Sequence, residues 1–242
     1  MNAIHTFNLE FKISVLLYHQ IGISPSDETN INCFCKTTEF YNQMQFLSKS
    51  NEFEVISLAS AINLVSASKC IDRNYVVLTF DDGCESFYDI TYPILNSFSF
   101  PATVYPISGF LDDYLKIKGK LYKHLKIMSK SMIQELSRNG VKFGAHSVNH
   151  IKFTEVMESE IESEIKNSKN SLEQILGIPI DSFSYPHGAY NDRIIDMLIS
   201  AGFSNAVTCN SGSLSNSNSL FEIPRKYITF FDDLDAFKRK LT

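Results

Sequence analysis

The chain has 242 residues, of which 44% are hydrophobic and 20% are charged, and these values are typical of a soluble globular protein with a substantial core. Its formal net charge of −5 argues against nucleic acid or an anionic membrane surface as a partner. No stretch is apolar over enough residues to span a bilayer.

The N-terminal residues and the cysteines bear on where the protein works. Residues 1–12 lack the basic start, apolar middle and small-residue cleavage site of a signal peptide. The five cysteines are odd in number and scattered, which excludes a full disulfide framework and favours a reducing compartment. The sequence therefore predicts a cytoplasmic protein, and it leaves the oligomeric state open.

Runs of β-branched and aromatic residues predict strands, and apolar residues at helical spacing predict helices. The predicted strands are 13–18, 53–58, 75–80, 102–107, 141–145, 182–185, 205–208 and 221–230. The predicted helices are one that begins at Thr37 or Thr38, then 59–66, 85–98, 129–140, 154–176, 192–201, and a last one capped by Asp232 or Asp233. This alternation predicts a parallel α/β sheet, and at this length a closed barrel in a single domain, 1–242.

Two of the predicted connections are long. Residues 108–128 include a basic tract and are expected to form a lid or binding loop, with a solvated charged face as the alternative. Residues 209–219 are rich in serine and asparagine and are expected to form a flexible loop. Both loops are candidates for choosing the substrate.

The clearest predicted helix is 154–176. Apolar residues line one stripe of it, from Met157 to Ile175, and Gly177 and Pro179 end it. Its N-terminal half also carries Glu155, Glu158, Glu160, Glu162 and Glu164. The helix dipole favours negative charge at that end.

Two adjacent carboxylates follow a predicted strand that is rich in β-branched and aromatic residues. Asp81 and Asp82 come directly after 75–80, and Gly83 gives the chain the freedom to turn there. Like charges at the end of an apolar strand are costly unless something pairs with them. A metal ion held by one carboxylate, with the other free to accept a proton, would remove that cost. The alternative is a solvated turn.

Several polar residues share the same relation to a strand. His19, Asp81, Asp82, His146 and His187 each lie at or just after the end of a predicted strand. The carboxyl ends of parallel strands meet at one rim of a barrel, where active sites are built. We therefore expect these side chains to converge.

His146 and His150 are four residues apart, and on a helical turn that spacing places both imidazoles on one side. Together with Asp82 they would give a divalent ion two nitrogens and an oxygen, with positions left open for water and substrate. Zinc fits this ligand set best, although iron(II) and other divalent ions also accept it.

Three segments resemble the motifs of the polysaccharide deacetylases, carbohydrate esterase family 4. They are 79–83 (TFDDG), 144–150 (GAHSVNH) and 183–190 (FSYPHGAY). The resemblance extends to 17–19 (LYH), 100–104 (FPATV) and 223–225 (IPR). It implies a distorted barrel of fewer than eight β/α units and a metal-dependent hydrolase that removes acetyl groups from N-acetylated sugars, either saccharide precursors or polysaccharides.

The resemblance also implies roles for individual residues. Asp82, His146 and His150 correspond to the metal ligands and Asp81 to the general base. The metal would lower the pKa of a water molecule and polarise the acetyl carbonyl. A backbone N–H, taken to be that of His187, would stabilise the oxyanion, so that residues 185–187 (Tyr185, Pro186, His187) form the substrate and oxyanion side of the site.

The sequence departs from the usual pattern of the family at three places. No histidine follows Pro224 to act as the acid, but His19 matches a circularly permuted branch in which this histidine lies on the first strand. Ser184 stands where an arginine often orients the base, which leaves Arg225 as the candidate for holding Asp81. His187 stands at a position that is more often aromatic, where it could touch substrate or enter the coordination sphere.

Two other functions are compatible with the same fold. One is a metal-independent hydrolase of cyclic amides, which the presence of all three predicted metal ligands disfavours. The other is a carbohydrate-binding barrel that has lost turnover, which only the missing arginine at Ser184 favours.

Overall fold

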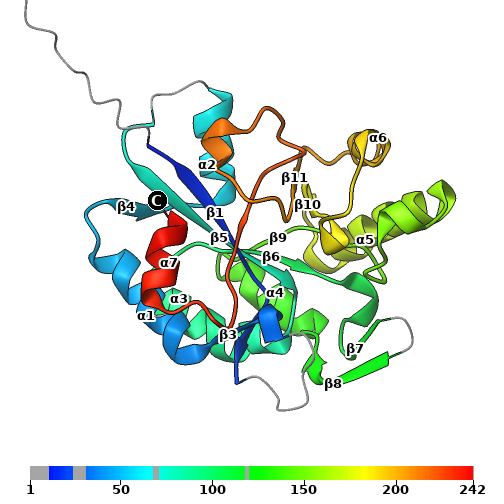
Figure 1. Ribbon diagram of the computed structural model, residues 1–242. Helices are drawn as coiled ribbons and strands as arrows, with labels where there is room; N and C mark the ends of the chain where they lie inside the picture. Colours follow the sequence, from blue (N-terminus) through cyan, green and yellow to red (C-terminus); the bar gives the residue numbers. More distant parts are fainter. Residues whose placement is uncertain (1–10, 24–30, 68–70, 118–119, 242) are drawn as a thin grey trace, which may run out of the picture.

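Strand and helix alternate along the chain as predicted, in a computed structural model that describes residues 11–23, 31–67, 71–117 and 120–241 (Figure 1). The strands are β1 (Ile13–Tyr18), β2 (Gln20–Gly22), β3 (Phe34–Lys36), β4 (Phe53–Val55), β5 (Asn74–Asp82), β6 (Thr103–Pro106), β7 (Tyr114–Ile117), β8 (Lys120–Lys126), β9 (Lys142–Phe143), β10 (Ser182–Ser184), β11 (Asn205–Val207) and β12 (Lys226–Tyr227). The helices are α1 (Thr37–Lys49), α2 (Leu58–Ser66), α3 (Tyr92–Ser97), α4 (Lys130–Arg138), α5 (Glu158–Leu176), α6 (Asp192–Ser200) and α7 (Leu234–Leu241).

The main sheet is parallel and has the strand order β12-β1-β5-β6-β9, with β4 paired to the first residues of β5. A separate parallel pair, β10 and β11, continues the wall. Isolated bridges join it at both sides, from Ala145 to Phe183 and from Val207 to Ile223. The prediction of a closed barrel was therefore wrong in one respect. The wall is a distorted barrel whose ladder is not continuous.

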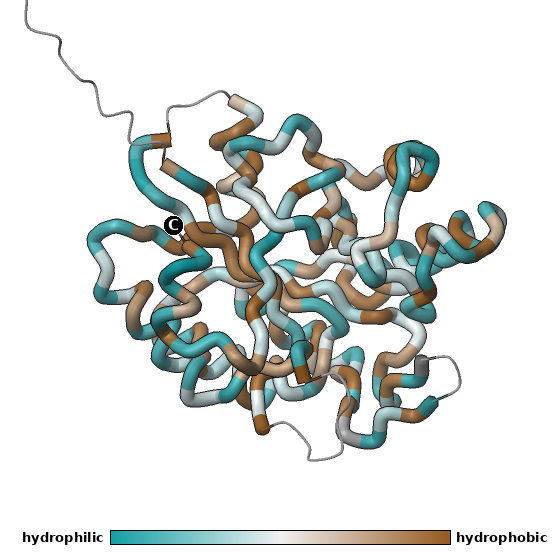
Figure 2. The backbone as a smooth tube through the Cα atoms, in the orientation of Figure 1, coloured by the Kyte–Doolittle hydropathy of each residue, from teal (hydrophilic) through white to brown (hydrophobic). Residues whose placement is uncertain are grey.

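Both faces of the central strands are buried, as expected for parallel strands. On β1, Ile13 and Val15 pack with Val77, Tyr105 and Val207 inside the barrel. The alternate residues of β1 and β5 pack beneath the helices. Figure 2 shows the hydrophobic residues concentrated along these central strands. Because side chains alternate, Thr79 and Asp81 follow Val77 on the inner face, which directs the Asp81 carboxylate into the barrel.

The predicted loop at 209–219 contributes to the core. It contains a short 3₁₀ turn, Leu214–Asn216, and Leu214 is fully buried with residues of α2. The hydroxyl of Ser213 lies 3.1 Å from both the backbone N and the O of Ile13. This part of the segment packs against the first residue of β1, at the end of the barrel opposite to Asp81, because β1 and β5 are parallel.

The predicted loop at 108–128 is largely a hairpin. β7 and β8 are antiparallel and project at the lower right of Figure 1. Leu115 and Ile127 are buried in a small apolar cluster with Ile107 and Cys84, which lies directly after β5 and Gly83. The hairpin therefore rests on the edge of the barrel where the predicted site lies.

Several predicted boundaries were wrong for local reasons. The residue that caps α1 is Lys36 rather than a threonine, and it forms no side-chain cap hydrogen bond. The segment predicted as a helix, 85–98, is helical over residues 85–97 as expected, but it contains a π-helical turn, Phe87–Thr91, before Pro93 in α3. The strand predicted for 221–230 is reduced to β12. Ser129 and Asp233 do cap their helices, through bonds to the amides of Met132 and Ala236.

The helices also differ in what they bury. α5 begins at Glu158, so Met157 precedes the apolar stripe and is 74% exposed.

Within the described ranges, no helix combines the length and apolarity needed to cross a membrane. The four cysteines in those ranges, Cys33, Cys35, Cys84 and Cys209, are all free thiols, and Cys70 lies outside them.

Candidate metal-dependent active site

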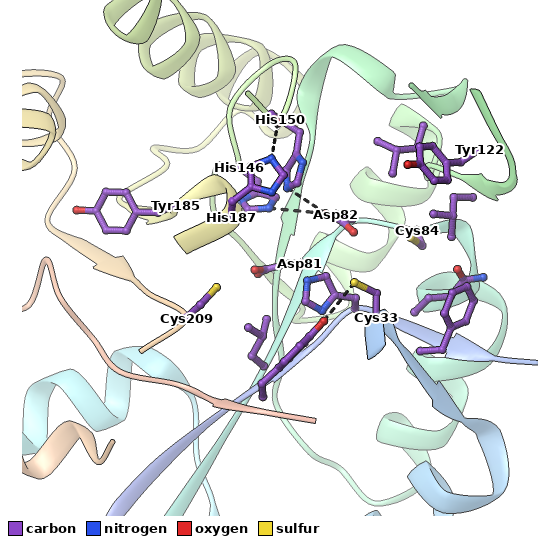
Figure 3. Close-up of a pocket in the computed structure, with 17 residues that line it drawn as sticks. Cys33, Asp81, Asp82, Cys84, Tyr122, His146, His150, Tyr185, His187 and Cys209 are labelled. Carbon is purple, nitrogen blue, oxygen red and sulfur yellow. Dashed lines mark hydrogen bonds and ion pairs between the residues drawn. The ribbon is translucent and has the colours of Figure 1, made fainter. Parts of the chain in front are cut away.

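A cavity of about 260 Å³ opens at the carboxyl ends of the strands (Figure 3). Seven of the residues singled out in the sequence line it: His19, Asp81, Asp82, His146, His150, Tyr185 and His187. The expected convergence of strand-end residues is therefore observed. Apolar side chains from the hairpin complete one wall, namely Leu115, Tyr122 and Leu125.

Asp82, His146 and His150 form the part of the cavity suited to a metal. One ligand atom from each lies within 4.8 Å of the other two. Nε2 of each histidine is 3.7 Å from Oδ1 of Asp82. Figure 3 shows the two imidazoles and the carboxylate directed toward one another. Two nitrogens and one oxygen leave coordination positions open, as a catalytic ion requires.

The backbone conformation that brings these ligands together differs from the predicted helical turn. Residues 146–150 are not helical, and Ser147 and His150 have left-handed φ values of 63° and 54°. Asp82 has a φ of 67°, although it ends β5. This turn of the backbone lets the Asp82 and Asp81 side chains reach the same cavity. Non-glycine residues rarely adopt such φ values, and they persist where the surroundings enforce them.

The tautomer of His146 is fixed by its neighbour. Its Nδ1 is 2.8 Å from the backbone oxygen of Ser184, and because a carbonyl oxygen only accepts, Nδ1 donates the hydrogen bond. Nε2 then presents its lone pair toward Asp82. A hydrogen bond of this kind orients the imidazole of a metal-binding histidine.

The residues fit a divalent cation. Oδ1 of Asp82 and Nδ1 of His150 are buried and have no hydrogen-bond partner in the described part of the chain. Burial raises the pKa of Asp82 to about 6 and lowers the pKa values of both His146 and His150, so the imidazoles favour the neutral form that binds metals. A cation would compensate for the buried carboxylate and give its unpartnered oxygen Oδ1 a partner.

Asp81 lies beside this cluster but is bound differently. Arg225, which is fully buried, donates from Nη1 to Oδ1 at 2.8 Å and from Nη2 to Oδ2 at 2.7 Å. The hydroxyl of Ser184 donates to Oδ2 at 3.0 Å. Burial raises the pKa of Asp81, but the charge and the hydrogen bonds of Arg225 outweigh burial and hold the pKa well below its ordinary value. Asp81 is therefore ionised.

Arg225 is itself held in place by three further contacts. Its Nε donates to the backbone oxygen of Thr208 at 2.8 Å, and Nη1 lies 3.2 Å from Oγ1 of Thr79. Nη2 is 3.0 Å from Oγ of Ser184. The guanidinium therefore reaches Asp81 from the segment before β12, as expected where the third motif carries Ser184 in place of an arginine.

His19 lines the same cavity as the metal cluster. Its ring is 5.2 Å from that of Tyr227 in an edge-on contact, and Nδ1 has no hydrogen-bond partner among the described residues. Burial lowers the pKa of His19 below its ordinary value, and the charges of Asp82 and Asp81 offset only part of this effect. The hydroxyl of Tyr227 in turn contacts Sγ of Cys33 at 3.1 Å.

Residues 185–187 lie in different environments. His187, with a φ of 58°, donates from Nε2 to the backbone oxygen of His150 at 3.1 Å, and its ring lies 4.4 Å from that of His150. The ring of Tyr185 stacks on Tyr190, and its hydroxyl donates to the backbone oxygen of Phe221. Pro186 is buried. The metal-binding cluster identified in the described residues does not include His187.

Some residues at the site were not predicted from the sequence. Glu164 is buried and contacts the loop that carries the metal ligands, although it stands in a run of surface-like glutamates. Tyr227, Cys33 and the hairpin residues carry no motif, so only the fold brings them to the cavity. The sequence patterns that did indicate the site were the two carboxylates before Gly83 and the histidine pair His146 and His150.

Comparison with known proteins supports the resemblance that the three sequence motifs indicated. Residues 68–206 match the model of the polysaccharide deacetylase family. YxkH of Bacillus subtilis (strain 168) is 23% identical over 214 residues, which cover 88% of this chain and 70% of YxkH. The poly-beta-1,6-N-acetyl-D-glucosamine N-deacetylase of Escherichia coli (strain K12) is 26% identical over 256 residues, which cover 93% of this chain but only 38% of that enzyme.

A solved structure resembles the fold over nearly its whole length. The deacetylase PplD of Streptococcus pyogenes, in complex with acetate, superimposes with a TM-score of 0.82 at 25% sequence identity. The match covers 96% of this chain and 98% of PplD. It therefore includes β1 and β12, which lie outside the segment matched by the family model.

Proposed function

Because the chain belongs to the polysaccharide deacetylase family, we propose that it hydrolyses the acetamide of an N-acetylated sugar, in a saccharide precursor or a polysaccharide, with the help of a divalent ion. The observation that carries the proposal is the division of roles between two neighbouring carboxylates. Asp82 faces two imidazoles, whereas Asp81 is held ionised by Arg225 and Ser184. One carboxylate is thus arranged to bind a cation and the other to accept a proton.

Asp82, His146 and His150 would hold the ion, and we propose that it is zinc. Once bound, the ion supplies Lewis acidity, which lowers the pKa of water and polarises the acetyl carbonyl. The separate hydrogen bond from His146 to Ser184 keeps the imidazole oriented whether or not the ion is bound.

The chain's own residues carry the proton transfers in this proposal. Asp81 accepts a proton from the water molecule that attacks the acetyl carbon, because its carboxylate is ionised and lines the same cavity. His19, which lines the same cavity, donates a proton to the departing sugar amine. The amine then leaves as a neutral group rather than as an anion.

The oxyanion needs a hydrogen-bond donor on the wall formed by residues 185–187. The N–H of Tyr185 donates to the oxygen of Val207, and Pro186 has no N–H. We assign the donor role to the backbone N–H of His187, whose left-handed conformation reorients the peptide at the cavity wall.

We also propose that residues 1–242 act as a single domain, since β1 and β12 belong to the same sheet as β5.

The function is tested by acetate release. We expect the purified protein to release acetate from N-acetylglucosamine oligosaccharides, to lose this activity after treatment with a chelator, and to regain it with zinc. Losing the ion is expected to lower the rate by about 10³-fold or more, since the ion supplies several kcal/mol of transition-state stabilisation. A series of divalent ions added back would identify the preferred metal.

Two results would contradict this function. Full activity in metal-free protein would exclude the proposed role of the ion. Tight binding of the oligosaccharide without acetate release from any substrate in the presence of zinc would favour a binding protein.

The acid role of His19 makes a separate prediction. His19→Ala is expected to lower kcat on an N-acetyl sugar by about 10²- to 10⁴-fold with an unchanged metal content. The same variant is expected to retain most of the activity on 4-nitrophenyl acetate, whose leaving group departs without protonation. Equal losses on the two substrates would show that His19 does not act as the acid.

A further inference from the structure

Glu164 is a buried carboxylate that the proposed reaction does not use. It lies on α5, and the residue is 5% exposed. Among the ion pairs of the described residues, none includes Glu164. A buried carboxylate requires partners of its own, because burial without them is costly.

The partners of Glu164 all belong to the segment between the two histidines of the metal cluster. Its Oε2 accepts hydrogen bonds from the backbone N–H groups of Val148 and Asn149, both at 2.8 Å. Its Oε1 accepts from the side-chain Nδ2 of Asn149 at 2.6 Å. Three donors therefore converge on the two oxygens of one buried side chain, which compensates for the cost of its burial.

This segment has a conformation that would not persist without support. Ser147 and His150 are both in the left-handed region, which is unfavourable for residues with a side chain. The Ser147 hydroxyl accepts the N–H of His150 at 2.9 Å. The backbone oxygens of Ser147 and Val148 accept from the N–H groups of Ser108 and Gly109.

The support comes from two sides. A side chain at Gly109 would place Cβ 2.4 Å from the oxygen of Val148, so the segment is packed closely against residues 108–109. Glu164 holds the opposite, N–H side of the same peptides. The loop is therefore fixed by both its carbonyl and its amide groups.

We propose that Glu164 is a positioning residue that sets the geometry of the metal ligand His150 relative to His146. This inference rests on the proposed function only in that it requires an ion at Asp82, His146 and His150. Glu164 belongs neither to the metal-binding cluster nor to the lining of the cavity. It acts by holding the two peptide groups that join Ser147 to Val148 and Val148 to Asn149, between the two histidines.

The donor and acceptor pattern supplies a test. In Glu164→Gln, the amide oxygen can accept the two backbone N–H groups, but the amide nitrogen then faces Nδ2 of Asn149, and two donors oppose each other. Adding Asn149→Asp places an acceptor there, so that the double variant restores all three hydrogen bonds with one of them reversed. The double variant also keeps the local charge of the parent.

The experiment compares four proteins, the parent, Glu164→Gln, Asn149→Asp and the double variant. Zinc affinity is measured by competition with a chromophoric chelator, and amide hydrogen exchange at residues 148–149 is measured in the metal-free proteins. We expect Glu164→Gln to bind zinc about 10- to 100-fold more weakly and to exchange these amides faster. Asn149→Asp, which opposes two carboxylates, is expected to be at least as weak. The double variant is expected to recover.

Glu173 provides a matched control on the same helix. Its Oε1 accepts the N–H of Ile180 at 2.9 Å and lies 3.1 Å from Nζ of Lys169, away from the metal ligands. Glu173→Gln is expected to change thermal stability without changing zinc affinity. If Glu164 only stabilised the fold, Glu164→Gln would resemble Glu173→Gln and would change thermal stability without changing zinc affinity.

The outcomes separate this inference from the proposed function. Parent-like zinc affinity in Glu164→Gln, or a double variant as weak as Glu164→Gln, would overturn the positioning role. A parent protein that binds no zinc would overturn the proposed function instead. In that case exchange in the metal-free proteins would still decide whether Glu164 holds the loop, and unchanged exchange in Glu164→Gln would exclude it.

Discussion

Asp81→Asn is expected to lower kcat by about 10²- to 10⁴-fold, the usual contribution of a general base, while the metal content per chain stays the same. The amide keeps the size of the carboxylate but cannot accept the proton of the attacking water. Asp81 does not belong to the metal-binding cluster, so the ion should remain bound. Activity is measured as acetate release, and metal content by elemental analysis of the purified variant.

The ester 4-nitrophenyl acetate, which also tests the His19→Ala variant, provides a second readout for Asp81→Asn. Attack by water precedes departure of the leaving group, so Asp81→Asn is expected to lose activity on 4-nitrophenyl acetate as well as on the sugar. Asp82→Asn serves as the comparison, because it should lose both metal and activity. Activity of Asp81→Asn within tenfold of the parent would remove Asp81 from its proposed role.

Arg225→Met is expected to lower the free energy of unfolding by about 3–5 kcal/mol, the usual cost of removing one partner of a buried ion pair. Arg225 is fully buried, and Asp81 would be left without its cation. Burial would then raise the pKa of Asp81 with less opposition, since Arg225 is the largest influence that lowers it. We therefore also expect the pH profile of kcat/KM to shift to higher pH.

Chemical denaturation measures the first effect, and Arg73 offers a matched control. Arg73 pairs with Glu54 at 3.0 Å, but the two side chains are 54% and 49% exposed. Arg73→Met is therefore expected to cost only about 0–1 kcal/mol. Arg225→Lys keeps the charge but loses the bidentate contact, so its loss in the free energy of unfolding should lie between those of Arg225→Met and Arg73→Met. A stability loss for Arg225→Met no larger than that for Arg73→Met would contradict the structure of this ion pair.

The fold could be predicted from the sequence where burial leaves a simple pattern. β1 was predicted with the boundaries that it has, because every residue from Ile13 to Tyr18 is buried and all of them except Ser14 are aliphatic or aromatic. The strand predicted around Pro224 failed for the opposite reason. Most of that segment contacts the barrel through single bridges and side chains, and such contacts leave no periodic signal.

The site could be predicted where chemistry requires particular residue types. Asp81, Asp82, His146 and His150 have few other reasons to stand at strand ends, so their identity and placement were informative together. Glu164 gave no such signal, because glutamates are common near the start of a helix. Its burial follows from the packing of α5 against residues 146–150, which helical periodicity within α5 cannot reveal.

The hairpin illustrates a different limit. Its lysines suggested a solvated face or a lid, and the structure pairs Lys116 with Asp113 and Lys126 with Glu85 on the outside. Leu115 faces inward and is buried. An alternation of this kind is typical of a strand, but the sequence contains no asparagine–glycine pair there to indicate a hairpin and its register.

The left-handed backbone at Asp82 limits which amino acids position 82 can accept. Only glycine, asparagine and aspartate adopt that conformation readily, and of these aspartate alone brings an anionic oxygen. A longer acid such as glutamate would keep the charge but meet a steric penalty in the main chain. Asparagine would satisfy the main chain but give up the charge. The left-handed φ and the need for a negative charge are independent requirements, and aspartate is the residue that meets both at position 82.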